Sequence, residues 1–156
     1  MKDDVSGILD KMMEADGLIL ASPNYINHIT GSMKTLLDRS AHFIHCSRLR
    51  EKYVAGVVTS GSGRGQDVLN YMAHYSHVCG AQFSGGVSSS VPIGDDKISE
   101  AFTLGTRLAV DIRKKRQYAE QLEKIEQFRR FFTTVMDMRK DEWTEEYQYW
   151  QEQGWC

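Results

Sequence analysis

The sequence predicts an α/β fold in which helices cover a doubly wound parallel sheet, and two observations support this prediction. Three short strand-like runs, at residues 17–21, 53–59 and 82–88, alternate with segments that carry apolar residues at helical spacing. The first two runs are almost entirely apolar, which is typical of parallel strands covered on both faces. The order helix, strand, helix, strand, helix, strand then predicts right-handed crossovers between parallel strands.

The elements of the first half follow in order. Residues 3–14 are expected to form a short amphipathic helix, because their apolar side chains recur at helical spacing behind two aspartates. Asp16-Gly17 ends this helix, and the apolar run 17–21 is the first strand. Residues 31–43 carry apolar side chains on one side and charged ones elsewhere, so we expect a second helix there.

A glycine-rich turn and a third helix lead to the last strand. The turn at 59–65 precedes a predicted helix at 66–78, and the strand at 82–88 follows. After Pro92 two longer helices are expected, one packing on the sheet and one beyond it. Their apolar positions are Ile98, Phe102, Leu104, Leu108 and Ile112 in the first, and Leu122, Ile125, Phe128, Phe132 and Val135 in the second.

The chain is expected to end in an aromatic stripe. Trp143, Tyr147 and Trp150 lie at helical spacing, which favours docking on a core or an interface. We therefore predict two parts: a partial α/β domain at 1–117, and a helical C-terminal extension at 118–156 that packs on the domain or on a partner subunit.

Composition and charge narrow the class of protein. The 156 residues are 41% hydrophobic and 26% charged, as in one globular domain, and the net charge of −2 gives no electrostatic reason to expect nucleic acid or an anionic membrane as partner. No apolar run approaches the roughly 18 residues that span a bilayer. The Met-Lys-Asp-Asp start lacks a secretion signal, and three widely spaced cysteines suit free thiols. We expect a cytoplasmic protein.

Two turns are predicted to meet at the carboxyl ends of the strands, where doubly wound sheets bind ligands. The first, Ser22-Pro23-Asn24-Tyr25-Ile26-Asn27, offers backbone amides, hydroxyl and amide groups and one aromatic ring. The second runs from Thr59 to Gly65, and its glycines let the backbone come close to a ligand. Together the turns are suited to bracket a flat heterocycle that has acceptors on its edge.

Other interpretations of these residues stay open. Ser22-Pro23 is also an ordinary strand-ending turn, the G-x-G-x-G loop is either a phosphate cradle or a plain turn, and Arg64 either meets a phosphate or is a solvated arginine. We predict no metal site. We also predict no catalytic side chain, and no cysteine has the neighbours that a nucleophile would need. The histidine and cysteine groups at helical spacing match no metal signature; they are His42, His45 and Cys46, and His74, His77 and Cys79.

One long stretch resembles a known family. Residues 15–39, ADGLILASPNYINHITGSMKTLLDR, look like the segment of the NADPH-dependent FMN reductase and iron-sulfur flavoprotein family that typically reads A-D-G-I-I-x-x-S-P-x-Y followed by G-x-M-K and D-R. The turn at 59–65 resembles the glycine-rich loop after that family's next strand, and the ending at 143–155 resembles the aromatic tail of several members. The resemblance runs from about residue 3 to the end.

The resemblance implies a flavodoxin-like sheet that binds FMN, with NAD(P)H as possible co-substrate. Ser22, Pro23, Asn24, Tyr25 and Asn27 would line the flavin ring, with Tyr25 beside it, and Thr59, Ser60, Gly61 and Gly63 would lie on its other side. The cofactor would carry out the hydride or electron transfer, while the protein supplies binding and electronic tuning.

The front of the sequence departs from this family. Members begin with a strand, a Ser/Gly-rich loop that holds the flavin phosphate, a helix and a second strand, often followed by a cysteine cluster, and none of these precedes residue 3 here. The strand at 17–21 nevertheless needs a neighbour on each side, and only the run at 53–59 is evident. Three explanations stay open: a truncated chain, a second polypeptide with the missing half, or self-association that covers the edge.

We therefore expect an FMN-dependent NAD(P)H oxidoreductase, either a flavin reductase or a flavoprotein electron carrier, that serves a small electron acceptor as a homo-oligomer. The alternative is a non-catalytic remnant or a split-flavoprotein fragment that acts as an oligomeric interaction module. Loss of a phosphate loop would weaken FMN binding severely and would favour this alternative.

Overall fold

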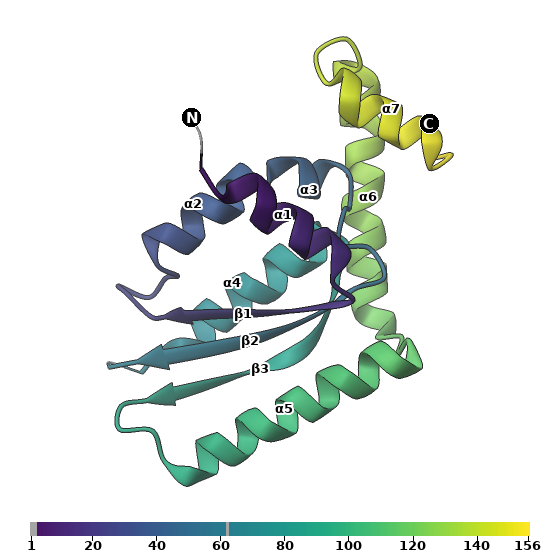
Figure 1. The fold of residues 1–156 in the computed structure, drawn as a ribbon. Coiled ribbons are helices and arrows are strands. Elements are labelled where there is room, and N and C mark those ends of the chain that lie inside the picture. Colours follow the sequence, from purple (N-terminus) through teal and green to yellow (C-terminus); the bar gives the residue numbers. More distant parts are fainter. Residues whose placement is uncertain (1–2, 62) are drawn as a thin grey trace.

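The computed structural model describes residues 3–61 and 63–156 and shows a three-stranded parallel sheet with helices on both faces (Figure 1). Strands β1 (Gly17–Pro23), β2 (Tyr53–Ser60) and β3 (Gln82–Ser90) lie in the order β1-β2-β3, and both pairs are parallel. Each connection therefore crosses over the sheet to the neighbouring strand. The predicted parallel α/β sheet is confirmed.

Four helices share one face of the sheet and form the larger core. They are α1 (Val5–Glu14), α2 (Gly31–Arg39), α3 (Ala41–His45) and α4 (Gly65–Val78). Buried side chains from these helices meet the inward side chains of the strands; among them are Leu9, Leu37, Phe43 and Met72 from the helices and Leu20, Val54 and Val58 from the strands.

The helix predicted at 31–43 is divided in the structure. α2 ends at Arg39, and α3 begins at Ala41. The hydroxyl of Ser40 donates to the carbonyl oxygen of Leu37 at 2.7 Å, and it also lies 2.7 Å from the hydroxyl of Tyr75. Serine side chains that bond nearby backbone groups compete with the helical pattern, which explains the break.

A single helix, α5 (Asp95–Lys114), covers the other face. Leu104 and Leu108 are buried against Tyr53, Ala55 and Val87 of the sheet. Ile98 and Phe102, which were expected to pack on the sheet, are instead 59% and 79% exposed, so that part of the prediction is wrong. The reason is that α5 has no neighbouring helix on this face among the described residues, so only its central seam is covered (Figure 1).

The C-terminal helices stand at the far end of the molecule. α6 (Ala119–Arg139) rises past α4, and α7 (Thr144–Glu152) folds back on it (Figure 1). Trp150 is fully buried beside Cys46 and Met136, and its indole N–H donates to the carbonyl oxygen of His45 at 2.9 Å. The aromatic stripe thus packs on a core, while a domain boundary at 117/118 stays a prediction.

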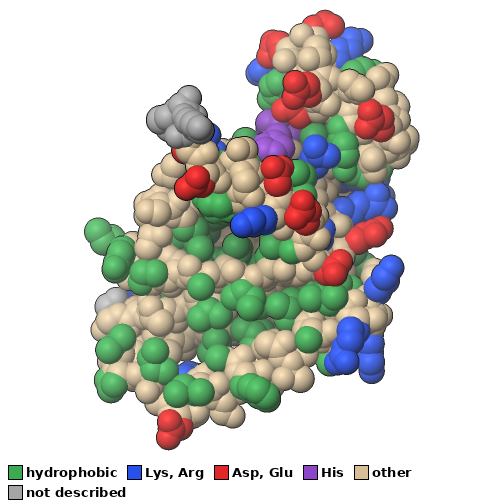
Figure 2. Space-filling view, in the orientation of Figure 1, with side chains coloured by type: hydrophobic (Ala, Val, Ile, Leu, Met, Phe, Trp, Pro, Cys, Tyr) green, Lys and Arg blue, Asp and Glu red, His purple; other side chains and the backbone are tan. Residues whose placement is uncertain are grey.

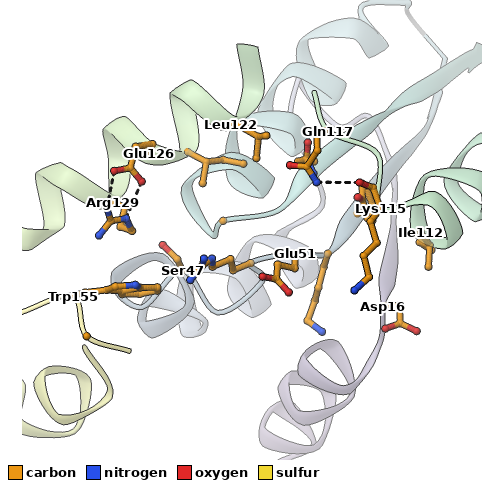
Figure 3. Close-up of a pocket in the computed structure, with 17 residues that line it drawn as sticks. Asp16, Ser47, Glu51, Ile112, Lys115, Gln117, Leu122, Glu126, Arg129 and Trp155 are labelled. Carbon is orange, nitrogen blue, oxygen red and sulfur yellow. Dashed lines mark hydrogen bonds and ion pairs between the residues drawn. The ribbon is translucent and has the colours of Figure 1, made fainter. Parts of the chain in front are cut away.

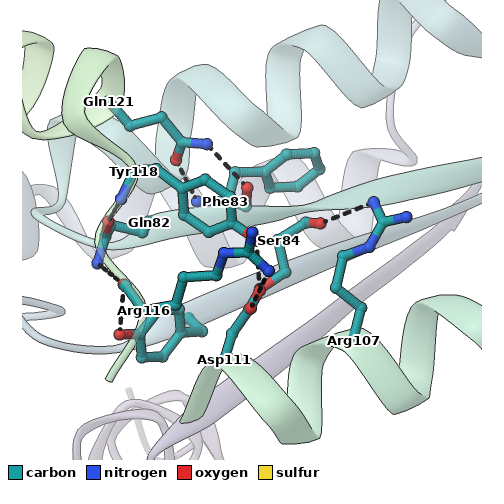
Figure 4. A network of polar contacts seen from close by, with 9 residues as sticks. Gln82, Phe83, Ser84, Arg107, Asp111, Arg116, Tyr118 and Gln121 are labelled. Carbon is teal, nitrogen blue, oxygen red and sulfur yellow. Dashed lines mark hydrogen bonds and ion pairs between the residues drawn. The ribbon is translucent and has the colours of Figure 1, made fainter. Parts of the chain in front are cut away.

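Side chains close the outer edge of β3 (Figure 4). The amide of Gln121 accepts from the backbone N–H of Phe83 at 2.7 Å and donates to its carbonyl oxygen at 3.0 Å, as a neighbouring strand would. Gln82 binds the α5–α6 turn in the same way, because its side chain accepts from Tyr118 N at 2.7 Å and donates to Arg116 O at 3.1 Å. This polar network ties α6 to the sheet and occupies the amino end of the β3 edge, at Phe83.

None of the helices in residues 3–61 and 63–156 combines the length and apolar character needed to cross a membrane.

Candidate functional site

The two turns that the sequence analysis singled out lie side by side at the carboxyl ends of β1 and β2. The backbone N–H of Asn24 donates to the carbonyl oxygen of Thr59 at 2.7 Å. The side-chain amide of Asn24 donates to Ser60 Oγ at 3.2 Å and to the carbonyl oxygen of Gly63 at 3.1 Å. Asn24 therefore fastens the first turn to the glycine loop and brings the two turns that carry the predicted site residues together.

The first turn is held by the start of α2. Ser22 Oγ accepts from the backbone N–H of Thr30 at 3.0 Å, and Thr30 caps α2 by accepting from Met33 N at 3.2 Å. Pro23 is the last residue of β1, and the chain leaves the sheet directly after it. The strand end and the helix start thus fix the two ends of the loop that carries Tyr25.

The tip of this loop is a tight, strained turn. Tyr25 and His28 exchange backbone hydrogen bonds of 3.0 and 3.2 Å, and the two residues between them, Ile26 and Asn27, have φ angles of 53° and 61°. A β-branched residue rarely adopts a positive φ. The turn leaves Tyr25 65% and Ile26 99% exposed, so the tip of the loop presents an aromatic and an aliphatic side chain to solvent.

Ile26 is a feature that sequence reasoning missed. It was counted in the turn but not among the site residues. Its positive φ comes from the backbone bonds between Tyr25 and His28, and the Ile-Asn pair carries no sequence signal for such a turn. Strain of this kind costs about 1–3 kcal/mol and tends to gather at functional sites.

The glycines of the second turn have different roles. Gly63 has a φ of 79°, which glycine adopts freely, and a side chain there would meet no atom within 4 Å. Gly61 also faces open space, whereas a Cβ on Gly65 would come within 2.6 Å of Ser88 Cβ. Gly61 and Gly63 therefore leave room for a ligand, and Gly65 is required for packing. Ser62 lies outside the described residues.

The orientation of Asn24 leaves one buried acceptor without a partner. A carbonyl oxygen only accepts hydrogen bonds, so the contact with Gly63 O fixes which end of the amide faces the glycine loop. Asn24 is 9% exposed as a whole, and its Oδ1 atom is buried and has no hydrogen-bond partner. An unsatisfied buried acceptor costs about 1–3 kcal/mol.

These features fit the ring of FMN. The edge of that ring alternates acceptors with one N–H donor, and its faces are flat and suited to an aromatic neighbour. The two turns offer the exposed ring of Tyr25 and the open backbone at Gly61 and Gly63. Ser22, Pro23, Asn27, Thr59 and Ser60 lie in the same two turns, and their direct contact with the ring stays a prediction.

A hollow of about 410 Å³ adjoins the glycine loop on the β3 side. Its walls combine hydroxyl groups with two cations, Arg64 and Lys97. Arg64 pairs with Asp67 at 3.2 Å and Lys97 with Glu100 at 2.8 Å, so both cations already have an anionic partner. Ser60, Gly63 and Arg64, which the sequence analysis singled out, line this hollow, whereas its other polar residues were not included there; they are Ser88, Ser89, Ser90, Asp96 and Lys97.

A larger hollow, of about 920 Å³, lies at the opposite end of the sheet (Figure 3). It is bounded by the amino ends of β2 and β3, by α6 and by the chain's C-terminal residues, among them Gln82, Leu122 and Trp155. Its rim carries both acidic and basic side chains, and Arg129 Nη2 lies 2.6 Å from Glu126 Oε1. Because neither predicted turn contributes to it, we place the candidate site at the carboxyl end.

The histidines and cysteines that lie at helical spacing contribute to packing. Burial raises the pKa of the Cys46 and Cys79 thiols to about 12, so neither is a thiolate near neutral pH. His45 stacks on Trp143 with ring centres 4.2 Å apart. In the described part of the chain no three His, Cys, Asp or Glu side chains gather closely enough to hold a metal ion.

Comparison with known proteins identifies the family of this chain. The model of the NADPH-dependent FMN reductase family matches residues 1–95. An iron-sulfur flavoprotein of Archaeoglobus fulgidus is 28% identical over 162 residues, a match that covers 98% of this chain and 71% of that relative.

Solved structures show the same fold. A WrbA-like flavodoxin from Agrobacterium tumefaciens superposes with a TM-score of 0.63 at 18% identity, over 69% of this chain and 73% of that one. General stress protein 14 of Treponema denticola, solved in complex with FMN, superposes with a TM-score of 0.52 at 14% identity, over 74% of this chain and 75% of that one. The flavodoxin-like fold is confirmed. Since the family match extends over residues 1–95 of 156, the chain belongs to the NADPH-dependent FMN reductase family of FMN-dependent oxidoreductases.

Proposed function

We propose that this protein is an FMN-dependent NAD(P)H oxidoreductase of the cytoplasm that passes electrons to a small acceptor, and that it acts as a homo-oligomer. The observation that carries the proposal is Asn24, whose side chain ties the two turns together at the carboxyl ends of β1 and β2. No observation favours the alternative of a non-catalytic interaction module.

The residues of the two turns, at 22–27 and 59–65, would bind and orient the cofactor. The exposed ring of Tyr25 would lie against the flavin, and Asn24 would hold together the two turns that flank it. The open backbone at Gly61 and Gly63 allows close approach from the other side. Bound FMN supplies the chemistry, namely acceptance of a hydride from NAD(P)H and release of the two electrons to an acceptor. The side chains need hold no proton for this.

The proposal is tested by flavin binding to the purified protein. A visible absorption spectrum shows whether flavin is retained, and titrations with FMN and with riboflavin give the two affinities. We expect FMN to bind and NAD(P)H to be oxidised when an artificial acceptor is present. A colourless protein that takes up no added FMN would contradict the proposal.

A pair of variants makes the site assignment specific. Tyr25→Ala removes an aromatic ring that is 65% exposed, and Phe131→Ala removes one that is 63% exposed on α6, far along the chain. Both should fold, since neither ring is buried. We expect Tyr25→Ala to weaken FMN binding about two- to tenfold, the range of one aromatic contact, and Phe131→Ala to leave it unchanged. Equal affinities in the two variants would place the flavin elsewhere.

A further inference from the structure

The hollow at the amino end of the sheet has the size of a small-molecule site. Its volume of about 920 Å³ lies within the roughly 300–1,000 Å³ that is usual for ligand pockets. Its walls come from parts far apart in the chain: the turn between α3 and β2, the amino ends of the strands, the turn between α5 and α6, α6 itself and residues 154–155. No residue of 22–27 or 59–65 contributes to these walls, so the hollow is separate from the candidate flavin site.

Strained backbone gathers around this hollow. Six residues other than glycine have a positive φ in the described part of the chain, and three of them line the hollow. These three are Ser47 at 46°, Glu51 at 64° and Lys115 at 46°. The other three lie in the two turns of the candidate flavin site. Such conformations cost free energy and cluster at ligand sites, so the strain singles out this hollow as a second candidate.

Lys115 shows most clearly that a side chain is kept at the expense of the backbone. α5 ends at Lys114, and Lys115 follows in the left-handed conformation, with φ 46° and ψ 50°. Glycine is the usual residue at this point, because it adopts the conformation without a Cβ clash. The chain has lysine there instead, and its side chain extends along the wall of the hollow (Figure 3).

The charged side chains at one end of the hollow, which we call the outer end, balance one another. Figure 3 shows Lys115, Glu51 and Asp16 at this end. Lys52 joins them, because its Nζ donates to the carbonyl oxygen of Ala15, the neighbour of Asp16, at 2.7 Å. Two cations and two carboxylates therefore meet at the outer end, and their formal charges cancel.

The inner end, which carries Trp155, keeps one cation unbalanced. Arg50 and Arg129 each place the guanidinium carbon 5.6 Å from the centre of the Trp155 ring. Arg129 also donates two hydrogen bonds to Glu126, at 2.9 and 2.6 Å, so its charge is neutralised. None of the ion pairs within residues 3–61 and 63–156 includes Arg50. The inner end thus offers a guanidinium group, whose fork of N–H donors suits the oxygens of a carboxylate or phosphate.

An apolar wall adjoins these charges. Leu122 and Ile125 of α6 line the hollow, and both are only half-buried, as is Trp155. An inorganic anion at Arg50 would leave this wall in contact with water. A ligand with an apolar body would cover it, and burial of apolar surface would add to the affinity.

We propose that this hollow is a second ligand site and that it binds a small organic anion. The carboxylate or phosphate of the ligand accepts hydrogen bonds from Arg50, and its apolar body lies against Trp155, Leu122 and Ile125. Lys115 attracts the anion from the outer end. The site lies beyond the proposed redox function, since no residue of the two flavin turns takes part.

Three naphthyl compounds test the charge preference. 1-Naphthylacetate, 1-naphthyl phosphate and 1-naphthylmethylamine share the ring system and differ in the charged group. Calorimetric titration of the purified full chain, without added FMN, gives the three affinities. We expect at least one anion to bind tenfold or more tightly than the amine, and the preference between the two anions shows whether the site takes a carboxylate or a phosphate. The proposal is overturned if neither anion binds more tightly than the amine, or if neither binds at ~10 mM.

A matched pair of arginine variants locates the anion. Arg50 lines the hollow, whereas Arg113, in the last turn of α5, does not; both are exposed, so both variants should fold. We expect Arg50→Gln to weaken binding of the preferred anion tenfold or more, and Arg113→Gln to change it less than twofold. FMN titrations of the same variants should give unchanged affinities, which separates this site from the flavin site.

A second pair tests whether the strain at Lys115 serves the ligand. Lys115→Gly and Lys114→Gly each remove one cation, but only Lys115 lines the hollow and has a positive φ. We expect Lys115→Gly to raise the urea midpoint and to weaken anion binding threefold or more. Lys114→Gly should lower the midpoint, because it places glycine within the helix, and should change binding less than twofold. Full anion affinity in both Arg50→Gln and Lys115→Gly would place the anion elsewhere and would overturn the proposal.

Discussion

At the scale of single residues, Asn24 decides the geometry of the candidate site. From the sequence it is one polar residue among six in a turn. Its contacts with Ser60 and Gly63, 36 and 39 residues further along the chain, orient its amide and leave Oδ1 buried and free. The sequence could thus identify the loop, but the orientation of the Asn24 amide depends on contacts with residues far along the chain.

The three cysteines should differ sharply in reactivity. Cys46 and Cys79 are buried, and burial raises the pKa of each thiol to about 12, whereas Cys156 is exposed. Since the thiolate is the reactive form, we expect Ellman's reagent to modify one thiol per folded chain at pH 8 and all three in denaturant. Rapid reaction of all three thiols in the folded protein would contradict the packing around α3 and α4.

The stability of the protein should fall on mild acidification. Burial lowers the pKa of His42, His45 and His77 below the ordinary histidine value. Around and below the unfolded pKa of about 6.5, the unfolded chain therefore binds protons that the folded chain does not, and the free energy of unfolding decreases as the pH falls. We expect a lower urea midpoint at pH 5 than at pH 7.

His45 offers the control for this effect. Its ring stacks on Trp143, and phenylalanine would keep the stacking without a titrating group. We expect His45→Phe to reduce the loss of stability between pH 7 and pH 5. A midpoint that rises on acidification in the original protein would refute the assigned direction.

At the scale of elements, glycines set how closely α4 lies on the sheet. A Cβ on Gly56 of β2 would come within 2.8 Å of Leu69 Cδ2, 3.1 Å of Phe83 Cζ and 3.3 Å of Met72 Sδ. The sequence shows this glycine inside an apolar strand, but it does not show that three large side chains surround it. Contact between α4 and the β2–β3 pair is what makes a side chain impossible there.

Substitution of Gly56 should therefore be costly. We expect Gly56→Val to lower the free energy of unfolding by about 1–3 kcal/mol through overpacking, as measured by urea denaturation. Gly105→Ala is the control, because it lies in open space within α5 and should raise stability by about 0.5–1 kcal/mol through helix propensity. If Gly56→Val were as stable as the original protein, the close packing of α4 would be wrong.

α5 shows where periodicity misleads. Its apolar residues recur at helical spacing, and this pattern correctly predicts a helix on the sheet, with Leu104 and Leu108 buried. The same pattern includes Ile98 and Phe102, which are exposed. Periodicity reports which side chains are apolar, whereas burial depends on whether a neighbouring element is present to cover them.

At the scale of the whole molecule, the two edges of the sheet differ within residues 3–61 and 63–156. Gln121 binds the backbone of Phe83 at the start of β3, while β1 pairs only with β2 and lies beside exposed Ile19 and Ala21. An exposed apolar edge of this kind favours intermolecular strand pairing. The protein alone should therefore aggregate through β1 unless a partner covers it.

A charge on the open edge should prevent such aggregation. Ile19 is 62% exposed, so Ile19→Lys should change the free energy of unfolding by no more than about 0.5 kcal/mol while reducing light scattering at high protein concentration. Ile8→Lys on α1, where the replaced side chain is 41% exposed, is the control and should not reduce scattering. An equal effect of both variants would mean that net charge, and not the β1 edge, governs solubility.

The sequence by itself determined the parallel α/β sheet, its three strands and the two turns of the site, because these follow from local patterns of apolar residues, glycines and prolines. It also carried the family resemblance, through Ser22-Pro23-Asn24-Tyr25 and the segment up to Arg39. Only the tertiary structure decided that Asn24 joins the turns, that Ile26 stands free on a strained backbone, and that Gln121 closes one edge while β1 stays open. Those features depend on contacts between residues far apart in the chain, which no local pattern encodes.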